Sequence, residues 1–323
     1  MTEDNYHEHM DEYGQQLTST TEGIDQKKNA QQEKKSFPTR ELRRSIKRQK
    51  AGAERSASSK PIAYRRNLPQ RYSTTTSQPL ERDLTPPLDK TPVNGVPINC
   101  PRGPLLLINT QAADVQNSPH LYKAFSGAFD KGNSLLYRRI AAGCHTELPE
   151  LGDLLFMDIE TTGLSNSPLF LIGIMRWETG GFKLSQYLAR NYAEEAAVIS
   201  SFIEACEPKT LLITFNGKTF DVPYIRARAA ATRTSCEINL PHFDLLHEAR
   251  RIWKDVLPDC RLQTLERHIC NRARKDDVPG EIIPEVYHEY VRSGNTALMT
   301  KVLRHNRLDL ITMADLMTRF PEQ

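Results

Sequence analysis

The alternation of hydrophobic and polar positions predicts regular structure in the part of the chain that follows Pro104. Apolar runs and strict apolar–polar alternation predict strands at 154–160, 169–177, 182–188 and 211–215. The first three follow one another closely, as in an antiparallel meander. Apolar residues at helical spacing predict helices at 195–206, 222–231, 245–253, 262–269, 285–292 and 296–317. This order indicates an α/β protein with a mixed sheet flanked by helices.

Residues 1–103 lack the composition of a packed domain. They contain neither of the two Trp, one of the eleven Phe and nine of the twenty Pro. Such a segment cannot bury enough apolar surface to offset the conformational entropy lost on folding. We therefore expect a disordered, basic and Pro-rich arm over 1–103, a lead-in segment over 104–149 and the folded domain over 150–320.

Positive charge is concentrated in the arm. Residues 27–72 carry fifteen Lys and Arg against three acids, whereas residues 104–323 carry 25 basic and 27 acidic side chains. A basic arm can make phosphate contacts that are independent of sequence and that salt weakens. A solvated tail and a tail that docks a partner protein are the alternatives. The nearly neutral folded part favours nucleic acid as the partner of the arm.

The cysteines and the apolar runs limit the cellular context. Six Cys are scattered without any C-x-x-C pair, which argues against a zinc ribbon and against a dense disulfide framework. The first residues, MTEDNYHEHM, lack the basic-then-apolar order of a signal peptide. The apolar runs are too short to span a bilayer. We expect a reduced cytoplasmic protein without a membrane partner.

Two carboxylates end the strand predicted at 154–160. Asp158 and Glu160 are two positions apart, so their side chains point to the same face of the strand and repel each other unless a cation lies between them. Asp221 follows the strand at 211–215 and a tight turn. Taken singly, the first two could be solvated acids, and Asp221 could be an ordinary helix N-cap.

The last predicted helix adds a histidine and a fourth acid. His305 and Asp309 are four positions apart and therefore share a helix face, although alone they could be a surface pair. Four carboxylates and one His from three distant segments suit Mg²⁺ or Mn²⁺, because these hard cations prefer oxygen ligands. Two such ions about 4 Å apart would stabilise the attacking and leaving oxygens of a displacement at phosphorus.

The residues around these acids resemble a known family. "FMDIETTGL", "ITFNGKTFDVP" and "HNRLD" resemble, in order, the three motifs of the DnaQ-like (DEDD) 3′–5′ exonuclease superfamily. "HFDLLHEARRIWKDVLPDCRLQTLERHI" and "DDVPGEIIPEVYHEYVRSGN" are similar to the YprB-type ribonuclease H-like subfamily within it. The resemblance covers roughly residues 150–318. It implies a ribonuclease H-like fold with a five-stranded mixed sheet.

The resemblance also implies roles for individual residues. The residues that match the family's metal ligands are Asp158, Glu160, Asp221 and Asp309. His305 matches the residue that orients or deprotonates the attacking water. Thr161, Thr162 and Leu164 match the stretch that holds the 3′-terminal nucleotide.

Two further side chains are candidates on their position alone, and one spacing departs from the family. Lys218 could contact a phosphate or be a solvated turn residue, and Phe220 could wedge against a terminal base or belong to the core. The histidine branch of the superfamily usually has four residues between its His and Asp. Here three residues separate His305 from Asp309.

The function that the resemblance implies is a divalent-metal-dependent 3′–5′ exonuclease. It would hydrolyse phosphodiester bonds at single-stranded ends of DNA or RNA, with a two-metal site of Mg²⁺ or Mn²⁺. A structure-specific endonuclease is the alternative among nucleases, since ribonuclease H-like folds host both activities. A nucleic-acid-binding module without catalysis is the alternative from another class, and the full set of four acids and one His argues against it.

Overall fold

The structure of the chain is a computed structural model that describes residues 93–115, 118–129, 135–144, 149–164, 166–178, 181–206 and 211–320. These residues belong to one unit, Tyr72–Gln323. Most of the predicted arm, residues 1–92, lies outside the described residues.

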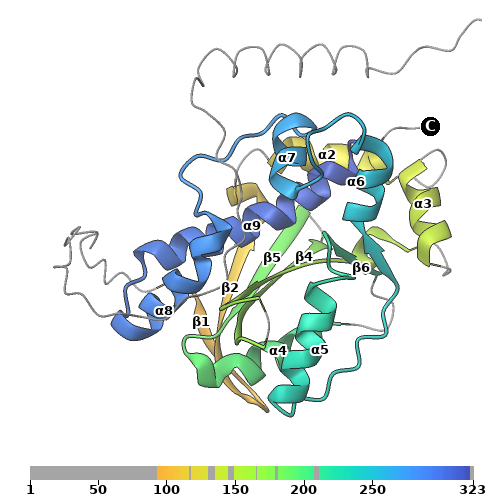
Figure 1. The fold of residues 1–323 in the computed structure, drawn as a ribbon. Coiled ribbons are helices and arrows are strands. Elements are labelled where there is room, and N and C mark those ends of the chain that lie inside the picture. The colour runs from red at the N-terminus through yellow and green to blue at the C-terminus, as the bar shows by residue number, and fades with distance from the viewer. Residues whose placement is uncertain are drawn as a thin grey trace, which may run out of the picture. The chain divides into compact units, whose positions relative to one another are not determined.

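A seven-stranded sheet in the order β1-β2-β5-β4-β3-β6-β7 forms the centre of the fold (Figure 1). Its strands are β1 (Val96–Cys100), β2 (Gly103–Gln111), β3 (Leu154–Thr161), β4 (Leu169–Glu178), β5 (Gly181–Leu188), β6 (Leu211–Thr214) and β7 (His242–Asp244). Neighbouring strands from β1 to β3 pair antiparallel, and β3, β6 and β7 run parallel. The predicted mixed α/β class and the meander of β3, β4 and β5 are therefore confirmed.

The expected number of five strands is wrong, because the sheet has seven. β1 and β2 lie partly within the Pro-rich segment, where Pro97 and Pro101 interrupt any strand-like pattern. β1 tolerates Pro97 because it is an edge strand, where a missing amide hydrogen need not break a ladder. β7 spans three residues, which is too few for a periodic signal.

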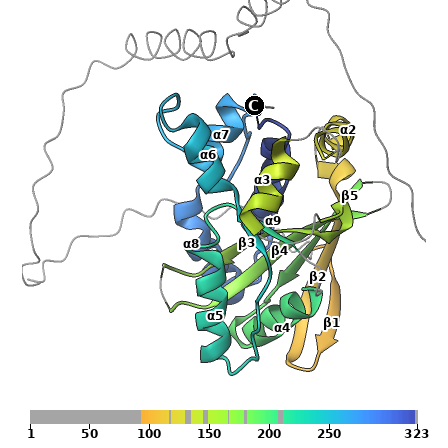
Figure 2. The same cartoon turned by 90° about the vertical axis from the view of Figure 1, so that its right-hand side faces the viewer.

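Helices cover both faces of the sheet (Figure 2). The α-helices are α2 (Ser118–Ala128), α3 (Leu135–Cys144), α4 (Glu195–Ala205), α5 (Asp221–Ala231), α6 (Leu245–Trp253), α7 (Leu262–His268), α8 (Ile283–Ser293) and α9 (Ala297–Met317). Short 3₁₀ helices are η1 (Ala112–Val115), η2 (Leu151–Asp153), η3 (Tyr192–Glu194) and η4 (Gly280–Ile282). The six predicted helices correspond to α4–α9, and α2 and α3 were not predicted.

Two side chains on β3 and β4 identify the faces that α9 and α4 cover. Asp158 of β3 points to the face where it contacts Asn306 of α9. Arg176 of β4 points to the other face and hydrogen-bonds the carbonyl of Ala205 at the end of α4. The sheet is thus buried between α9 on one side and α4 on the other. This double cover explains the continuous apolar run of β4, whose first seven residues are all buried.

An aromatic cluster fixes α2 on the same face as α9. The ring of Phe125 in α2 lies 4.9 Å from that of Phe182 and 5.9 Å from that of Phe156. α2 also contacts α9. Among the helices of the described residues, none has the length and apolar character needed to cross a bilayer.

Candidate active site

Asp158 and Glu160 lie near the end of β3, on the face covered by α9. Burial raises the pKa of Asp158, and the charges of Asp309, Glu160 and Asp221 raise it further. Burial and the charges of Asp309 and Asp221 also raise the pKa of Glu160. The alternative of two freely solvated acids therefore does not hold. The four carboxylates from three segments lie close enough to oppose one another's ionisation.

Asp221 is the buried first residue of α5. The N-cap position belongs to Phe220, so Asp221 is not the ordinary N-cap that its place after a turn allowed. Burial raises the pKa of Asp221 to about 7, although hydrogen bonds from the backbone of Asp221 and Ile159 oppose the rise. The charges of Asp244 and Asp309 add to it. The bond to Ile159 ties this carboxylate to β3.

The turn before Asp221 is organised by the buried carboxylate of Asp244. Its Oδ1 accepts hydrogen bonds from the amides of Asn216 over 2.8 Å and Leu246 over 3.0 Å. Its Oδ2 accepts from the amide of Lys218 over 3.0 Å. One side chain therefore caps α6 and holds the turn that presents Asp221.

His305 is 7% exposed and lies between two carboxylates. Its Nδ1 is 3.0 Å from both oxygens of Asp277, and its Nε2 is 3.4 Å from Oδ2 of Asp309. The surface pair that the helix spacing allowed is therefore wrong, because the imidazole is enclosed. When Nδ1 carries the hydrogen, it donates to Asp277, and Nε2 remains an acceptor on the side of Asp309.

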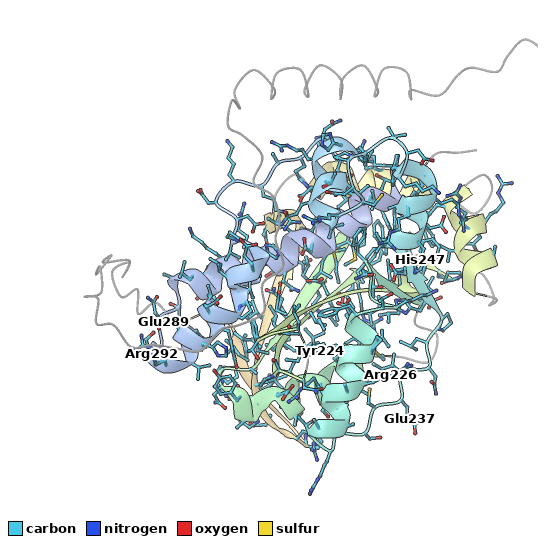
Figure 3. The ribbon with its side chains drawn as sticks, viewed as in Figure 1. Tyr224, Arg226, Glu237, His247, Glu289 and Arg292 are labelled. Atoms are coloured by element: carbon cyan, nitrogen blue, oxygen red, sulfur yellow. The ribbon has the colours of Figure 1, made fainter. Side chains whose placement is uncertain are left out.

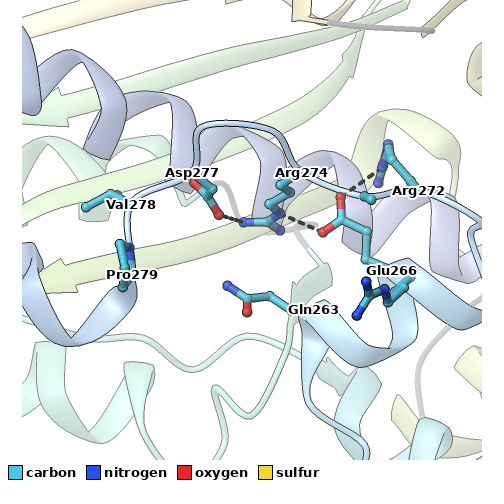
Figure 4. A pocket seen from close by; sticks show the side chains of 9 residues that line it. Gln263, Glu266, Arg272, Arg274, Asp277, Val278 and Pro279 are labelled. Atoms are coloured by element: carbon cyan, nitrogen blue, oxygen red, sulfur yellow. Dashed lines mark hydrogen bonds and ion pairs between the residues drawn. The ribbon is translucent and has the colours of Figure 1, made fainter. Parts of the chain in front are cut away.

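Arg274 joins this group from the segment between α7 and η4 (Figure 4). Its Nε lies 2.6 Å from Oε2 of Glu266, and its Nη1 lies 3.2 Å from Oδ2 of Asp277. Its Nη2 pairs with Oδ1 of Asp309. Burial opposes the charge of Arg274, but Asp309 and Glu266 outweigh it and raise the pKa of the guanidinium. Arg274 is thus a fixed internal cation at the edge of the carboxylate cluster.

Asn306, the residue after His305, contacts Asp158 directly. Its Nδ2 donates to Oδ2 of Asp158 over 2.8 Å, and its Oδ1 accepts from Nε2 of Gln186 over 2.8 Å. Gln186 also donates to the carbonyl of Leu303 over 2.8 Å. Asn306 and Gln186 are both fully buried. This chain of bonds orients Asp158 and, although burial has the larger effect on its pKa, favours its ionised form.

The end of β3 and the loop that follows it contain three of the predicted substrate contacts. The hydroxyls of Thr161 and Thr162 donate within the loop, to the carbonyls of Gly163 over 2.8 Å and Pro168 over 3.0 Å. Leu164 is 89% exposed. The two hydroxyls therefore shape the loop, and its apolar tip is open to a ligand.

The other two predicted contacts lie in the turn immediately before α5. Lys218 is exposed, whereas Phe220 is partly buried and packs against the core. The ring of Phe220 lies 5.3 Å from that of Tyr224. The hydroxyl of Tyr224 (Figure 3) lies 3.0 Å from the carbonyl of Gly163 and 2.8 Å from that of Ser167, either of which can accept its hydrogen, so α5 also supports the loop after β3.

The donor set fits a hard divalent cation, because four carboxylates supply oxygen ligands and carry mutual repulsion that a cation would relieve. Within the part of the chain that the structure describes, however, no group of three or more His, Cys, Asp or Glu side chains has the geometry to hold a metal ion. One oxygen of Asp309 pairs with Arg274, and one oxygen of Asp158 bonds Asn306. Metal binding would therefore require these side chains to share or exchange partners.

Sequence reasoning missed Asn306, Arg274, Asp277 and Gln186. Asn306 stands directly between two predicted site residues and could have been found, because it precedes Asp309 by three positions on the same helix. Arg274 and Asp277 lie in a segment without regular structure, and Gln186 lies within an alternating strand. Asp277 belongs to the DDVPG stretch that carries the resemblance, although no role was predicted for it. The contacts of Arg274 and Gln186 depend on the tertiary fold, and no local pattern marks these two residues.

Comparison with known proteins places the chain in a family. A model described as the RNase_H superfamily matches residues 155–320, which include all four carboxylates and His305. The uncharacterized protein YprB of Bacillus subtilis (strain 168) is 34% identical over 170 residues, which cover 51% of this chain and 41% of that protein. The chain therefore spans less than half the length of this relative.

Two solved structures are also similar, at low identity. The family B DNA polymerase of the archaeon Pyrobaculum calidifontis matches with a TM-score of 0.40 and 15% identity, over 50% of this chain and 24% of the polymerase. Exonuclease I of E. coli, in complex with an oligonucleotide, matches with a TM-score of 0.28 and 17% identity, over 46% of this chain and 44% of the exonuclease. The family model covers half of the sequence, and on that ground the chain belongs to the ribonuclease H superfamily.

Proposed function

We propose that this chain is a divalent-metal-dependent 3′–5′ exonuclease that hydrolyses phosphodiester bonds at single-stranded ends of nucleic acid. The observation that carries the proposal is the cluster of Asp158, Glu160, Asp221 and Asp309 beside the buried His305. Carboxylates that raise one another's pKa values repel when ionised and so destabilise the fold unless a cation binds between them.

Each residue of the cluster has a role in this proposal. Mg²⁺ or Mn²⁺ ions held by the four carboxylates would stabilise the charge on the attacking and leaving oxygens. Nε2 of His305 would accept the proton of the attacking water, as imidazole does near neutral pH. Asp277 would keep the hydrogen on Nδ1 and hold the ring in place. Asn306 would hold Oδ2 of Asp158 and leave its other oxygen for the cation.

The surroundings of the cluster support a nucleic-acid substrate. Leu164, at the exposed tip of the loop after β3, is suited to contact the terminal nucleotide, and Thr161 and Thr162 hold that loop. Lys218 could contact a phosphate from the turn before α5, and Phe220 would support that turn. Among these residues Lys218 carries the one charge, which suits a phosphate common to DNA and RNA, so both are candidate substrates.

A cleavage assay tests the proposal. The full chain and Asp158→Ala are incubated with 5′-labelled single-stranded DNA and RNA, in Mg²⁺, in Mn²⁺ and in chelator. Asp255→Ala removes an exposed acid outside the cluster and is the matched control. We expect a ladder of products that shortens from the 3′ end and requires metal. Asp158→Ala should abolish the ladder, and Asp255→Ala should retain it.

The other outcomes separate the alternatives. Internal cuts would identify an endonuclease. Tight binding without cleavage of single-stranded or structured substrates would identify a binding module. A ladder that persists in chelator would overturn the role of the metal.

A further inference from the structure

A pocket of about 400 Å³ lies beside the carboxylate cluster, between α7 and the segment that follows it. Figure 4 shows its lining, in which Arg274 and Asp277 stand on one side and Gln263 on the other. Arg274 and Asp277 also contact Asp309 and His305. A group bound in this pocket would therefore be one side chain away from the proposed reaction centre.

The inner wall of the pocket is a rigid network of paired arginines and carboxylates. Arg272 and Arg274 both pair with Glu266, which is 1% exposed, over 2.9 Å and 2.6 Å. Arg272 also donates to the hydroxyl of Thr312 over 2.8 Å. The ionisable residues that line the pocket are three arginines and two carboxylates, so the lining carries an excess of one positive charge.

The outer wall offers hydrogen-bond donors that no group among the described residues uses. Gln263 and Arg267 are four positions apart on α7 and both line the pocket. Both are exposed, and within the described residues neither makes a hydrogen bond or an ion pair. The guanidinium of Arg267 can therefore present its fork of N–H groups to an anion without breaking an existing contact.

We propose that this pocket binds a backbone phosphate of the nucleic-acid strand, with Arg267 and Gln263 as the direct contacts. The inference rests on the proposed function, because it takes the strand to end at the carboxylate cluster. Arg272 and Arg274 are balanced by Glu266 and Asp277, so the excess positive charge of the lining is that of Arg267. A strand held here would be anchored next to Asp309 by a phosphate contact, which is independent of the base sequence.

The salt dependence of binding tests the pocket without relying on catalysis. Affinity for a fluorescent single-stranded oligothymidylate is measured in chelator over a range of salt, and the probe is checked to remain intact. The loss of one phosphate contact lowers the slope of log affinity against log salt by about 0.7 for a single strand. We expect this loss, with several-fold weaker binding, for Arg267→Ala.

Matched variants separate the effect of the pocket from the general effect of removing one positive charge. Arg261→Ala removes an exposed arginine at the beginning of the same helix that does not line the pocket, so its slope should stay close to that of the full chain. Arg267→Lys should retain most of the slope, because the charge remains. Equal slopes for Arg267→Ala and Arg261→Ala would overturn the pocket as a phosphate site. If Arg267→Ala lowered the slope of log affinity against log salt but the full chain cleaved no substrate, the phosphate site would be supported and the proposed exonuclease activity contradicted.

Discussion

Gly173 of β4 leaves the space that the side chain of Asn306 occupies. A Cβ on Gly173 would lie 2.0 Å from Oδ1 and 2.7 Å from Cγ of Asn306, far inside contact distance. Gly173 pairs with Asp158 on β3 and with Gln186 on β5, so the three residues form a row across the sheet. Asn306 lies over the middle of this row and bonds both ends. The glycine is therefore what allows α9 to orient Asp158.

Gly173→Ala should disturb this arrangement although it adds one methyl group. Overpacking of a buried contact costs about 1–3 kcal/mol, and Asn306 would have to move away from Asp158. We expect a lower free energy of unfolding in denaturant and weaker binding of Mn²⁺ in calorimetric titration. Gly152→Ala is the control, because a Cβ there meets nothing within 4 Å. Equal behaviour of the two variants would contradict the fit between Gly173 and Asn306.

A double-mutant cycle measures the same contact directly. Asn306→Ala removes the group that a Cβ at residue 173 would strike, and it leaves Asp158 without its amide donor. Loss of a partner that orients a metal ligand costs about 10- to 100-fold in metal affinity or activity. We therefore expect a large effect of Asn306→Ala alone, and Gly173→Ala should add little in that background. Strict additivity of the two free energies of unfolding would show that the residues do not interact.

Arg274→Gln should destabilise the fold through repulsion within the carboxylate cluster. The guanidinium pairs with Glu266, Asp277 and Asp309, and its removal leaves these acids without their shared cation. Breaking a buried ion network of this kind costs about 3–5 kcal/mol. Divalent cations should therefore raise the melting temperature of the variant more than that of the unchanged chain.

An exposed arginine provides the comparison for Arg274. Arg292 (Figure 3) forms a surface pair with Glu289 over 2.6 Å, and solvent screens that pair. Arg292→Gln should leave both the melting temperature and its response to Mn²⁺ unchanged. If Arg274→Gln gave the same result, Arg274 would have no electrostatic role in the cluster.

His242 should make the fold sensitive to acid. Burial lowers its pKa to about 4 from an ordinary value of 6.5, and its Nε2 lies 2.7 Å from the hydroxyl of Thr214. Between these two values the unfolded chain binds more protons at this site than the folded chain does. Its contribution to stability is therefore complete above pH 6.5 and is lost as the pH falls towards 4. The free energy of unfolding of His242→Gln should fall less steeply with acidification.

The carboxylate cluster acts in the opposite direction, so the measurement must be differential. The raised pKa of Asp221, about 7, favours the folded state at lower pH. This effect is common to His242→Gln and the unchanged chain, and it cancels in their difference between pH 7 and pH 5. His247→Gln (Figure 3) changes an exposed ring and is the control. A pH dependence of His242→Gln identical to that of the unchanged chain would rule out this role for His242.

Local patterns predicted the elements that carry the cluster, because Asp158, Glu160 and Asp221 adjoin strongly apolar strands and His305 lies on a long periodic helix. They did not predict the partners of these residues. Gly173 and Gln186 are ordinary strand residues in the sequence, and their place beside Asp158 depends on the pairing of β3, β4 and β5. Arg274 reaches Asp309 across 35 positions from an irregular segment, where no periodicity operates.

A truncation must respect β1 if it is to test the arm. β1 begins at Val96 and pairs with β2, so removal of residues 1–103 would strip an edge strand from the sheet, whereas removal of 1–92 keeps every described residue. The shorter deletion removes the fifteen Lys and Arg of residues 27–72. We expect it to preserve the melting temperature and cleavage, and to reduce the salt slope of nucleic-acid binding by far more than one contact. An unchanged slope would exclude nucleic acid as the partner of the arm and leave the solvated tail and the protein-docking tail, because a basic segment that neutralises no phosphate releases no counterions.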